Sequence, residues 1–178
     1  MKRLILLLLC AALLLTGCVS GVEAKNLRGE WAYIHDTETV ILKLTAGGKA
    51  VFHEKDYTYT CDAEFITLTS GEEELCLRYK LENEQLYLYE QTEYVYEGGM
   101  PNDGLVGKWS DKDDNWSFEF TDTGTFREDG YFPGSYSVNE AEGTFKLMYN
   151  DPFEDATCYY TIDGNKLLVE YPWVLVPM

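Results

Sequence analysis

The two histidines of the chain are the first side chains that suggest chemistry. His35 is followed by Asp36 and His53 by Glu54, so a zinc ion bound by two imidazoles and a carboxylate is one interpretation. A structural zinc site takes four ligands, usually at short regular spacings, and this pattern lacks both. The alternative is that both histidines are polar residues near strand ends, and we predict no metal site.

A short acidic segment is the second candidate. Residues 111–115 (Asp-Lys-Asp-Asp-Asn) resemble the opening of a calcium-binding loop. That loop requires Gly at its sixth position and Glu at its twelfth, where this chain has Trp116 and Asp122. We interpret the segment as an acidic connection before a strand, with weak calcium binding as the alternative.

Signatures of catalysis are missing from the sequence. It contains no Gly-x-Ser-x-Gly, His-Glu-x-x-His or Cys-x-x-Cys motif and no phosphate-binding glycine loop. Carboxylates are plentiful, but nothing in the sequence places two of them in one pocket. We therefore predict no catalytic residues, no cofactor and no enzymatic activity, and the sequence does not identify ligand-binding residues.

The N-terminal residues indicate export. Lys2 and Arg3 precede an apolar run over residues 4–15, which is shorter than a membrane-spanning helix requires. The run ends in Leu15-Thr16-Gly17-Cys18, which resembles the lipobox of bacterial lipoproteins. The resemblance implies cleavage after Gly17, a lipid on the Cys18 thiol and anchoring at the extracytoplasmic face of the cell membrane. An ordinary signal peptide and an uncleaved anchor are the alternatives.

This interpretation divides the chain into a signal peptide (residues 1–17), a lipidated N-terminus and tether (residues 18–26) and a remainder long enough for one ordinary domain or two small ones. The net charge of −17 repels nucleic acid phosphates and anionic lipid headgroups, so we expect no nucleic acid partner. Aromatic residues make up 15% of the chain, which is enough to build a core.

An internal repeat organises the remainder. Leu27-Arg28-Gly29-Glu30-Trp31 recurs as Leu105-Val106-Gly107-Lys108-Trp109, and three further segments recur at offsets of 76 to 81 residues. Drift of the offset is typical of loop insertions between strands that keep their order. We predict two copies, over residues 27–97 and 105–178, joined by a linker at residues 98–104 that is rich in Gly, Pro and Asn.

Within each copy, apolar and polar residues alternate with a period of two. Residues 75–81 and 115–121 show the pattern most clearly, and Gly-containing turns separate such segments. We predict an all-β fold of about eight short antiparallel strands per copy, each copy closing into an up-and-down barrel because an open meander leaves exposed edges. One barrel-like structure shared by both copies is the alternative. The alternation places Cys61 inward and Cys76 outward, which opposes a disulfide between them.

The repeated Gly-x-Trp pairs, Gly29 with Trp31 and Gly107 with Trp109, resemble the signature at the first strand of lipocalins. The resemblance implies that each Trp closes one end of a barrel and that each Gly permits close backbone approach. Bacterial lipoproteins carry similar small domains. Each copy is about half the length of a lipocalin, and its aromatic residues are expected to fill the core. The expected inward aromatics are Trp31, Tyr33, Tyr59 and Tyr79 in the first copy, and Trp109, Phe118, Phe120, Tyr136 and Tyr160 in the second.

Two functions remain open at this point. The first is a tethered binding module for a small apolar or aromatic ligand outside the cell, which requires an accessible site. The second is a structural, interaction or inhibitor protein of the cell envelope, with filled barrels and no small ligand.

Overall fold

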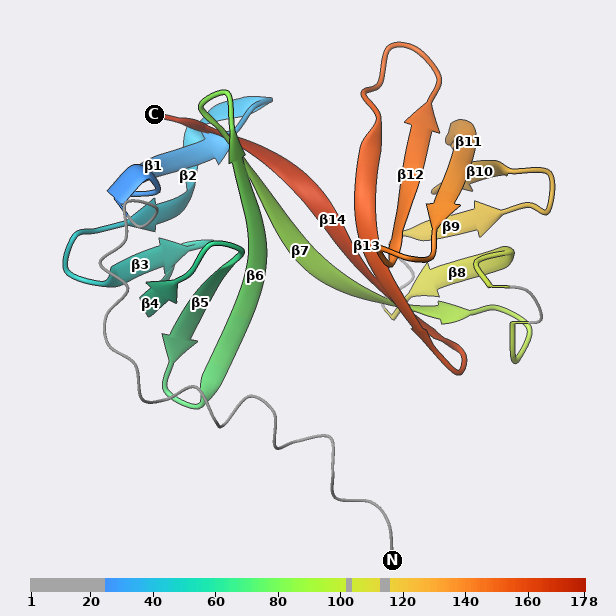
Figure 1. Cartoon of the computed structure of the whole chain (residues 1–178), viewed down its shortest axis with the longest axis horizontal. Coiled ribbons are helices and arrows are strands. Elements are labelled where there is room, and N and C mark those ends of the chain that lie inside the picture. The colour runs from blue at the N-terminus through green and yellow to red at the C-terminus, as the bar shows by residue number, and fades with distance from the viewer. Residues whose placement is uncertain (1–24, 102–103, 113–115) are drawn as a thin grey trace, which may run out of the picture.

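The computed structural model describes residues 25–101, 104–112 and 116–178, and within them the chain forms antiparallel β-strands (Figure 1). The first copy contains β1 (Gly29–Tyr33), β2 (Asp36–Leu44), β3 (Lys49–Phe52), β4 (Lys55–Cys61), β5 (Phe65–Ser70), β6 (Glu73–Glu82) and β7 (Gln85–Tyr96). The second contains β8 (Gly107–Asp111), β9 (Ser117–Phe120), β10 (Thr125–Glu128), β11 (Phe132–Asn139), β12 (Thr144–Tyr149), β13 (Ala156–Asp163) and β14 (Lys166–Pro177). The all-β prediction is confirmed.

The strands form one closed ring in which each pairs with the next in sequence and β14 returns to β1. A second ladder crosses this ring: β7 pairs with β14 from Leu86↔Leu175 to Val95↔Lys166 (Figure 1). The strands therefore form a single ring sheet and not clearly the two tandem barrels of about eight short strands that the sequence predicted. The described residues contain seven strands per copy, and β7 and β14 are each 12 residues long because each serves both copies.

Each copy is closed by the last strand of the other. The C-terminal end of β7 pairs with β8 through Tyr96↔Trp109, and the end of β14 pairs with β1 through Trp31↔Pro177. Because β7 and β14 hold equivalent places in the repeat, the ladder has an approximate two-fold axis at the pair Glu90↔Tyr171. The exchange is therefore reciprocal.

Two hydrophobic clusters fill the two halves of the ring. The first includes Trp31 and Tyr79 and takes Leu175 from the end of β14. The second contains Trp109 and takes Tyr94 from the end of β7. Several of the largest side chains are fully buried there: Trp109, Phe118, Phe120 and Phe145. Tyr33, Tyr59, Tyr136 and Tyr160 pack against the clusters while partly exposed, which agrees with the predicted inward aromatics.

The repeat extends to individual hydrogen bonds. In the turn after β2, Gly48 N donates to Thr45 O over 3.2 Å, and Gly124 N donates to Thr121 O over the same distance after β9. The hydroxyls of Tyr59 and Tyr136 donate to these same Thr carbonyls over 3.0 and 2.9 Å. Both glycines have a positive φ, near 70° and 78°, which disfavours other residues there. The two copies therefore share one turn design.

Candidate functional site

The residues predicted for lipid attachment lie outside the described part of the chain. These are Leu15, Thr16, Gly17 and Cys18. Among residues 25–101, 104–112 and 116–178, no helix has the length and apolar character needed to cross a bilayer.

The Gly-x-Trp residues occupy equivalent places at the entry to the two cores. Trp31 Nε1 donates to Leu27 O and Trp109 Nε1 donates to Leu105 O, each over 2.8 Å. A Cβ on Gly107 would lie 2.3 Å from the Tyr96 ring, so this glycine permits close approach, as the resemblance implies. Gly29 has no such neighbour, and its φ of 140° is what favours glycine there. Both tryptophans are buried and thus inaccessible to a ligand.

The other candidates from the sequence are scattered. His35 is exposed between β1 and β2, whereas His53 lies in the turn after β3, with Nε2 3.4 Å from the Glu90 carboxylate. Cys61 packs half-buried on the first cluster and Cys76 is exposed, as the alternation predicted. Among the described residues, no three His, Cys, Asp or Glu side chains converge as metal ligands. Residues 113–115 of the acidic segment lie outside the description.

Aromatic side chains gather at one end of the second copy, a feature that sequence reasoning missed. We call Trp116, Phe132, Tyr149 and Phe153 the aromatic rim. Phe132 stacks on Trp116 with ring centroids 6.4 Å apart and meets Phe153 edge-on at 5.2 Å, and Phe153 contacts Tyr149 at 6.4 Å. Trp116 is 39% exposed and Phe153 51% exposed, so large ring surfaces face solvent.

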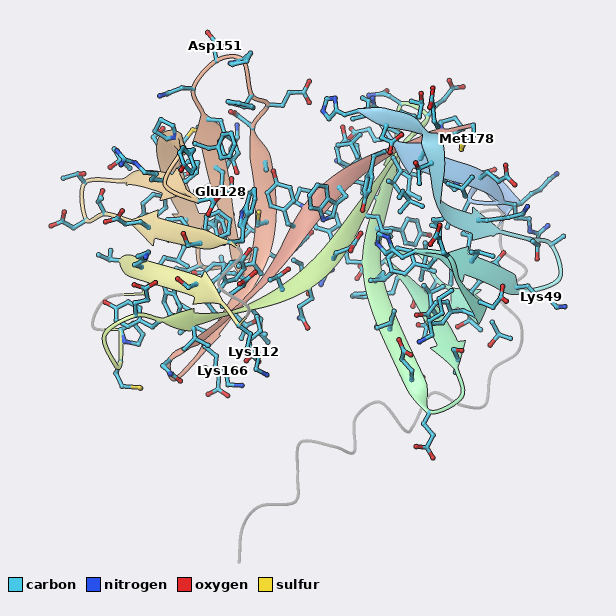
Figure 2. The ribbon with its side chains drawn as sticks, turned by 180° about the vertical axis from the view of Figure 1, so that it is seen from behind. Lys49, Lys112, Glu128, Asp151, Lys166 and Met178 are labelled. Carbon is cyan, nitrogen blue, oxygen red and sulfur yellow. The ribbon has the colours of Figure 1, made fainter. Side chains whose placement is uncertain are left out.

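A buried carboxylate, Glu128, holds two members of the rim. Glu128 is the last residue of β10 (Figure 2). Only 7% of its surface is exposed. Its Oε1 accepts a hydrogen bond of 2.6 Å from Trp116 Nε1, and its Oε2 accepts one from the Tyr149 hydroxyl. These donors compensate for the loss of water and fix the orientation of both rings.

Burial controls the protonation of the groups around Glu128. It raises the pKa of the Glu128 carboxyl, an effect that the hydrogen bonds from Tyr149 and Trp116 oppose. It also raises the pKa of Tyr149, and raises that of Tyr171 to about 12, so both hydroxyls remain protonated at neutral pH. The pKa of the buried Cys158 thiol is raised as well, which makes it a poor nucleophile. The arrangement is therefore suited to binding through ring faces.

The rim is specific to the second copy. At the positions equivalent to Trp116, Glu128 and Tyr149, the first copy has Val40, Phe52 and Ser70. The shared fold does not require a buried carboxylate or these aromatics, because the first copy closes without them. The available signal in the sequence was Glu128 itself, an acidic residue at an inward position of β10 two residues after Phe126.

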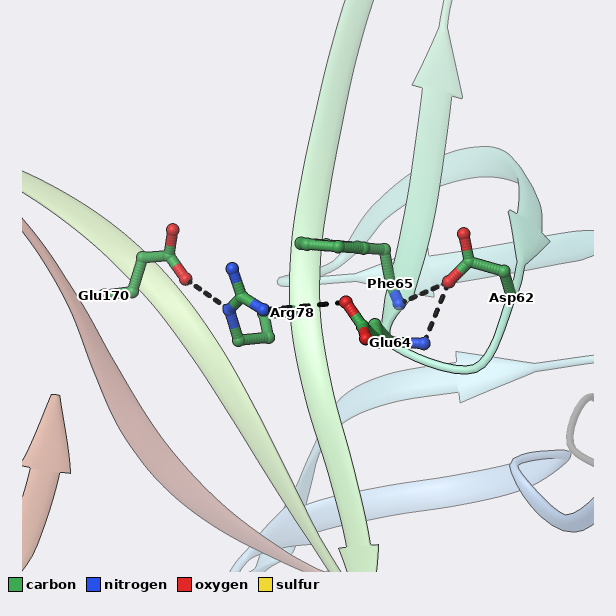
Figure 3. A network of polar contacts seen from close by, with 5 residues as sticks. All are labelled: Asp62, Glu64, Phe65, Arg78 and Glu170. Carbon is green, nitrogen blue, oxygen red and sulfur yellow. Dashed lines mark hydrogen bonds and ion pairs between the residues drawn. The ribbon is translucent and has the colours of Figure 1, made fainter. Parts of the chain in front are cut away.

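Two hollows are found in the described surface. One, of about 570 Å³, runs over the outer side of β9, β10 and β11. The other, of about 240 Å³, lies where the copies meet and is lined by Arg78, Tyr159 and Glu170. Arg78 Nε donates to Glu170 over 2.9 Å, and Figure 3 shows Arg78 between Glu170 and Glu64. Its guanidinium also covers the Tyr159 ring, 4.1 Å from the ring centroid. Arg78 of the first copy thus contacts Glu170 and Tyr159 of the second copy, and these contacts hold the two copies together.

Comparison of the chain with protein-family models, with curated proteins and with solved structures finds no match. The function is therefore inferred from the geometry of the site.

The buried position of Glu128 predicts a pH dependence of stability. Because its pKa is raised above the ordinary 4.5, its stabilising contribution is complete below that pH and is lost as the pH rises through the folded-state pKa. As the pH rises through this window, we expect the free energy of unfolding of Glu128→Gln to increase relative to that of the original protein, by at most about 1.4 kcal/mol per pH unit. Urea unfolding between pH 4 and 8 measures the difference.

The exposed Glu119 on β9 provides the control, because Glu119→Gln removes one charge without changing a buried site. Parallel stability curves for Glu128→Gln and the original protein would show that Glu128 does not titrate as a buried group.

Proposed function

We propose that the protein is an exported, lipid-anchored binding module without enzymatic activity, which captures a small apolar or aromatic ligand on the aromatic rim. The observation that carries the proposal is the exposed Trp116 held to the buried Glu128. Fixed aromatic surfaces lose little conformational entropy when a ligand binds, which favours affinity. The buried aromatic side chains of the second cluster support a binding surface on the rim rather than in the core.

We also propose a lipocalin-like interpretation of the ring. The first barrel comprises β1–β7 and the end of β14, and the second comprises β8–β14 and the end of β7. Each barrel then has eight strands, a number at which side chains can just fill the interior. The buried tryptophans after Gly29 and Gly107 support this interpretation.

The alternative is a structural, interaction or inhibitor protein of the cell envelope. The large side chains in the cores, such as Trp109 and Phe118, favour it, because they occupy the space that an internal ligand would need. In that case the aromatic rim would contact a protein surface, since exposed apolar patches also mark protein interfaces. The two functions differ in whether the isolated protein binds a small molecule.

The lipid anchor is tested by Cys18→Ser. Without the thiol no lipid can be attached, so we expect the exported variant to leave the membrane fraction while retaining its fold. Cell fractionation together with circular dichroism measures both properties. Retention of correctly exported Cys18→Ser protein in the membrane would contradict a lipid tether.

Ligand capture is tested with the released Cys18→Ser protein and N-phenyl-1-naphthylamine, a neutral apolar aromatic probe that fluoresces on binding. We expect saturable binding that weakens about tenfold or more in Trp116→Ala and Phe153→Ala, because each removes a large contact surface. Val138→Ala, at an exposed apolar position of β11 outside the rim, is the matched control.

Native mass spectrometry of the same protein, beside a denatured control, reports any ligand carried from the cell. A carried mass that disappears in Trp116→Ala would support the rim as its site. Absence of both probe binding and carried mass would overturn the small-ligand proposal in favour of the interaction protein.

A further inference from the structure

The face of the β7–β14 ladder that points into the ring carries a second group of aromatic and acidic side chains. Glu90 and Tyr171 are directly paired across the ladder and therefore lie on the same face. Trp173 shares that face, two residues from Tyr171 and two from the buried Leu175. It is 44% exposed, although it pairs across the ladder with Leu88 of the first cluster.

Two tyrosines hold Trp173 in place. Its ring centroid lies 5.4 Å from that of Tyr33, on β1, and 5.3 Å from that of Tyr171. The Tyr33 hydroxyl donates to Glu90 Oε1 over 3.3 Å, which links the aromatic group to the carboxylate. Three rings and one carboxylate from three strands therefore occupy one face.

The fold alone does not account for Trp173. Its equivalent in β7 is Thr92, which occupies the same place in the ladder of the other copy. A small polar residue is thus compatible with the strand pairing, whereas Trp173 exposes much of a large ring to solvent. An exposed ring fixed between two others has the form of a binding surface.

The aromatic rings and the carboxylate on this face favour a positively charged ligand. The electron-rich faces of Trp and Tyr attract cations, with Trp the strongest. Glu90 adds a negative charge, and a carboxylate has about four acceptor positions, so contacts with Tyr33 and His53 leave capacity for a further partner. The net charge of −17 raises the local concentration of cations around the whole chain.

We propose that Tyr33, Glu90, Tyr171 and Trp173 form a site for a small organic cation, an alkylated ammonium group. The alkylated group fits better than a metal ion because its apolar methyl surface contacts the rings while its charge faces Glu90. This site shares no residue with the aromatic rim, and the proposal does not rest on the function assigned to the rim.

The test is a titration of the Cys18→Ser protein with choline at physiological ionic strength, followed by the indole N–H resonance of Trp173 in NMR spectra. The neutral isostere 3,3-dimethylbutan-1-ol is the ligand control, because it has the same shape without the charge. We expect saturable shifts with choline, and binding at least about tenfold weaker for the isostere.

Two variants separate the charge from the rings. Glu90→Gln keeps the shape and removes the charge, and Trp173→Leu removes the central ring; we expect each to weaken choline binding about tenfold or more. Because Trp173→Leu lacks the reporting indole, its binding is measured by isothermal titration calorimetry beside that of the Cys18→Ser protein. Glu93→Gln is the matched control, since it removes the same charge from the opposite face of β7, where Glu93 pairs with Lys166. The indole resonances of Trp31 and Trp109 report whether each variant remains folded.

No saturable shift at millimolar choline would overturn the proposal. Equal binding of choline and its isostere, or unchanged binding by folded Glu90→Gln, would do so as well. Because the aromatic rim is intact in both variants, binding of N-phenyl-1-naphthylamine tests the proposed function separately.

Discussion

The ladder between β7 and β14 is the interaction on which the rest of the structure depends. A seven-strand meander leaves two open edges, and unpaired edge strands are a liability in solution. Here neither copy closes on itself: the end of β14 pairs with β1, and the end of β7 pairs with β8. The long ladder therefore makes the stability of each copy conditional on the other.

Contacts on the outer face of the ladder reinforce this dependence. Arg78 and Tyr159 hold equivalent places in the repeat, and they stack on one another across the approximate two-fold axis. Arg78 pairs with Glu170, while Tyr159 meets Tyr89 edge-on at 5.3 Å, so the two sides use different chemistry at equivalent positions. The copies have diverged at their contact as they have at the aromatic rim. Divergence on a shared framework allows one copy to carry a site without altering the closure of the other.

The sequence predicted local structure well because local structure depends on patterns that sequence displays directly. Period-two alternation identified the strands, and the Gly turns after Leu44 and Phe120 fall where the repeat placed them. Pairing between distant strands has no such local pattern. In β7 the inward Leu86 and Leu88 are separated from Tyr94 by the polar residues 90–93, and nothing in this pattern shows that the first residues enter one core and the last enter the other.

The candidate sites were harder to predict for a related reason. A buried Glu and an exposed Trp each break the usual pattern, but their meaning depends on partners brought together by folding. Glu128 receives Trp116 from before β9 and Tyr149 from the end of β12, and no sequence spacing connects these three. The Gly-x-Trp pairs, by contrast, were visible because each acts within five residues of its own carbonyl partner.

The most direct test of the reciprocal closure is urea unfolding followed by fluorine NMR of protein labelled with 5-fluorotryptophan. Trp31 reports the first cluster and Trp109 the second, in one sample. We expect both resonances to lose intensity at the same urea concentration. We also expect Leu175→Ala, a change in the second copy, to lower both midpoints together. Separate midpoints, or a Leu175→Ala effect confined to either Trp31 or Trp109, would show that the copies fold independently and would contradict this account.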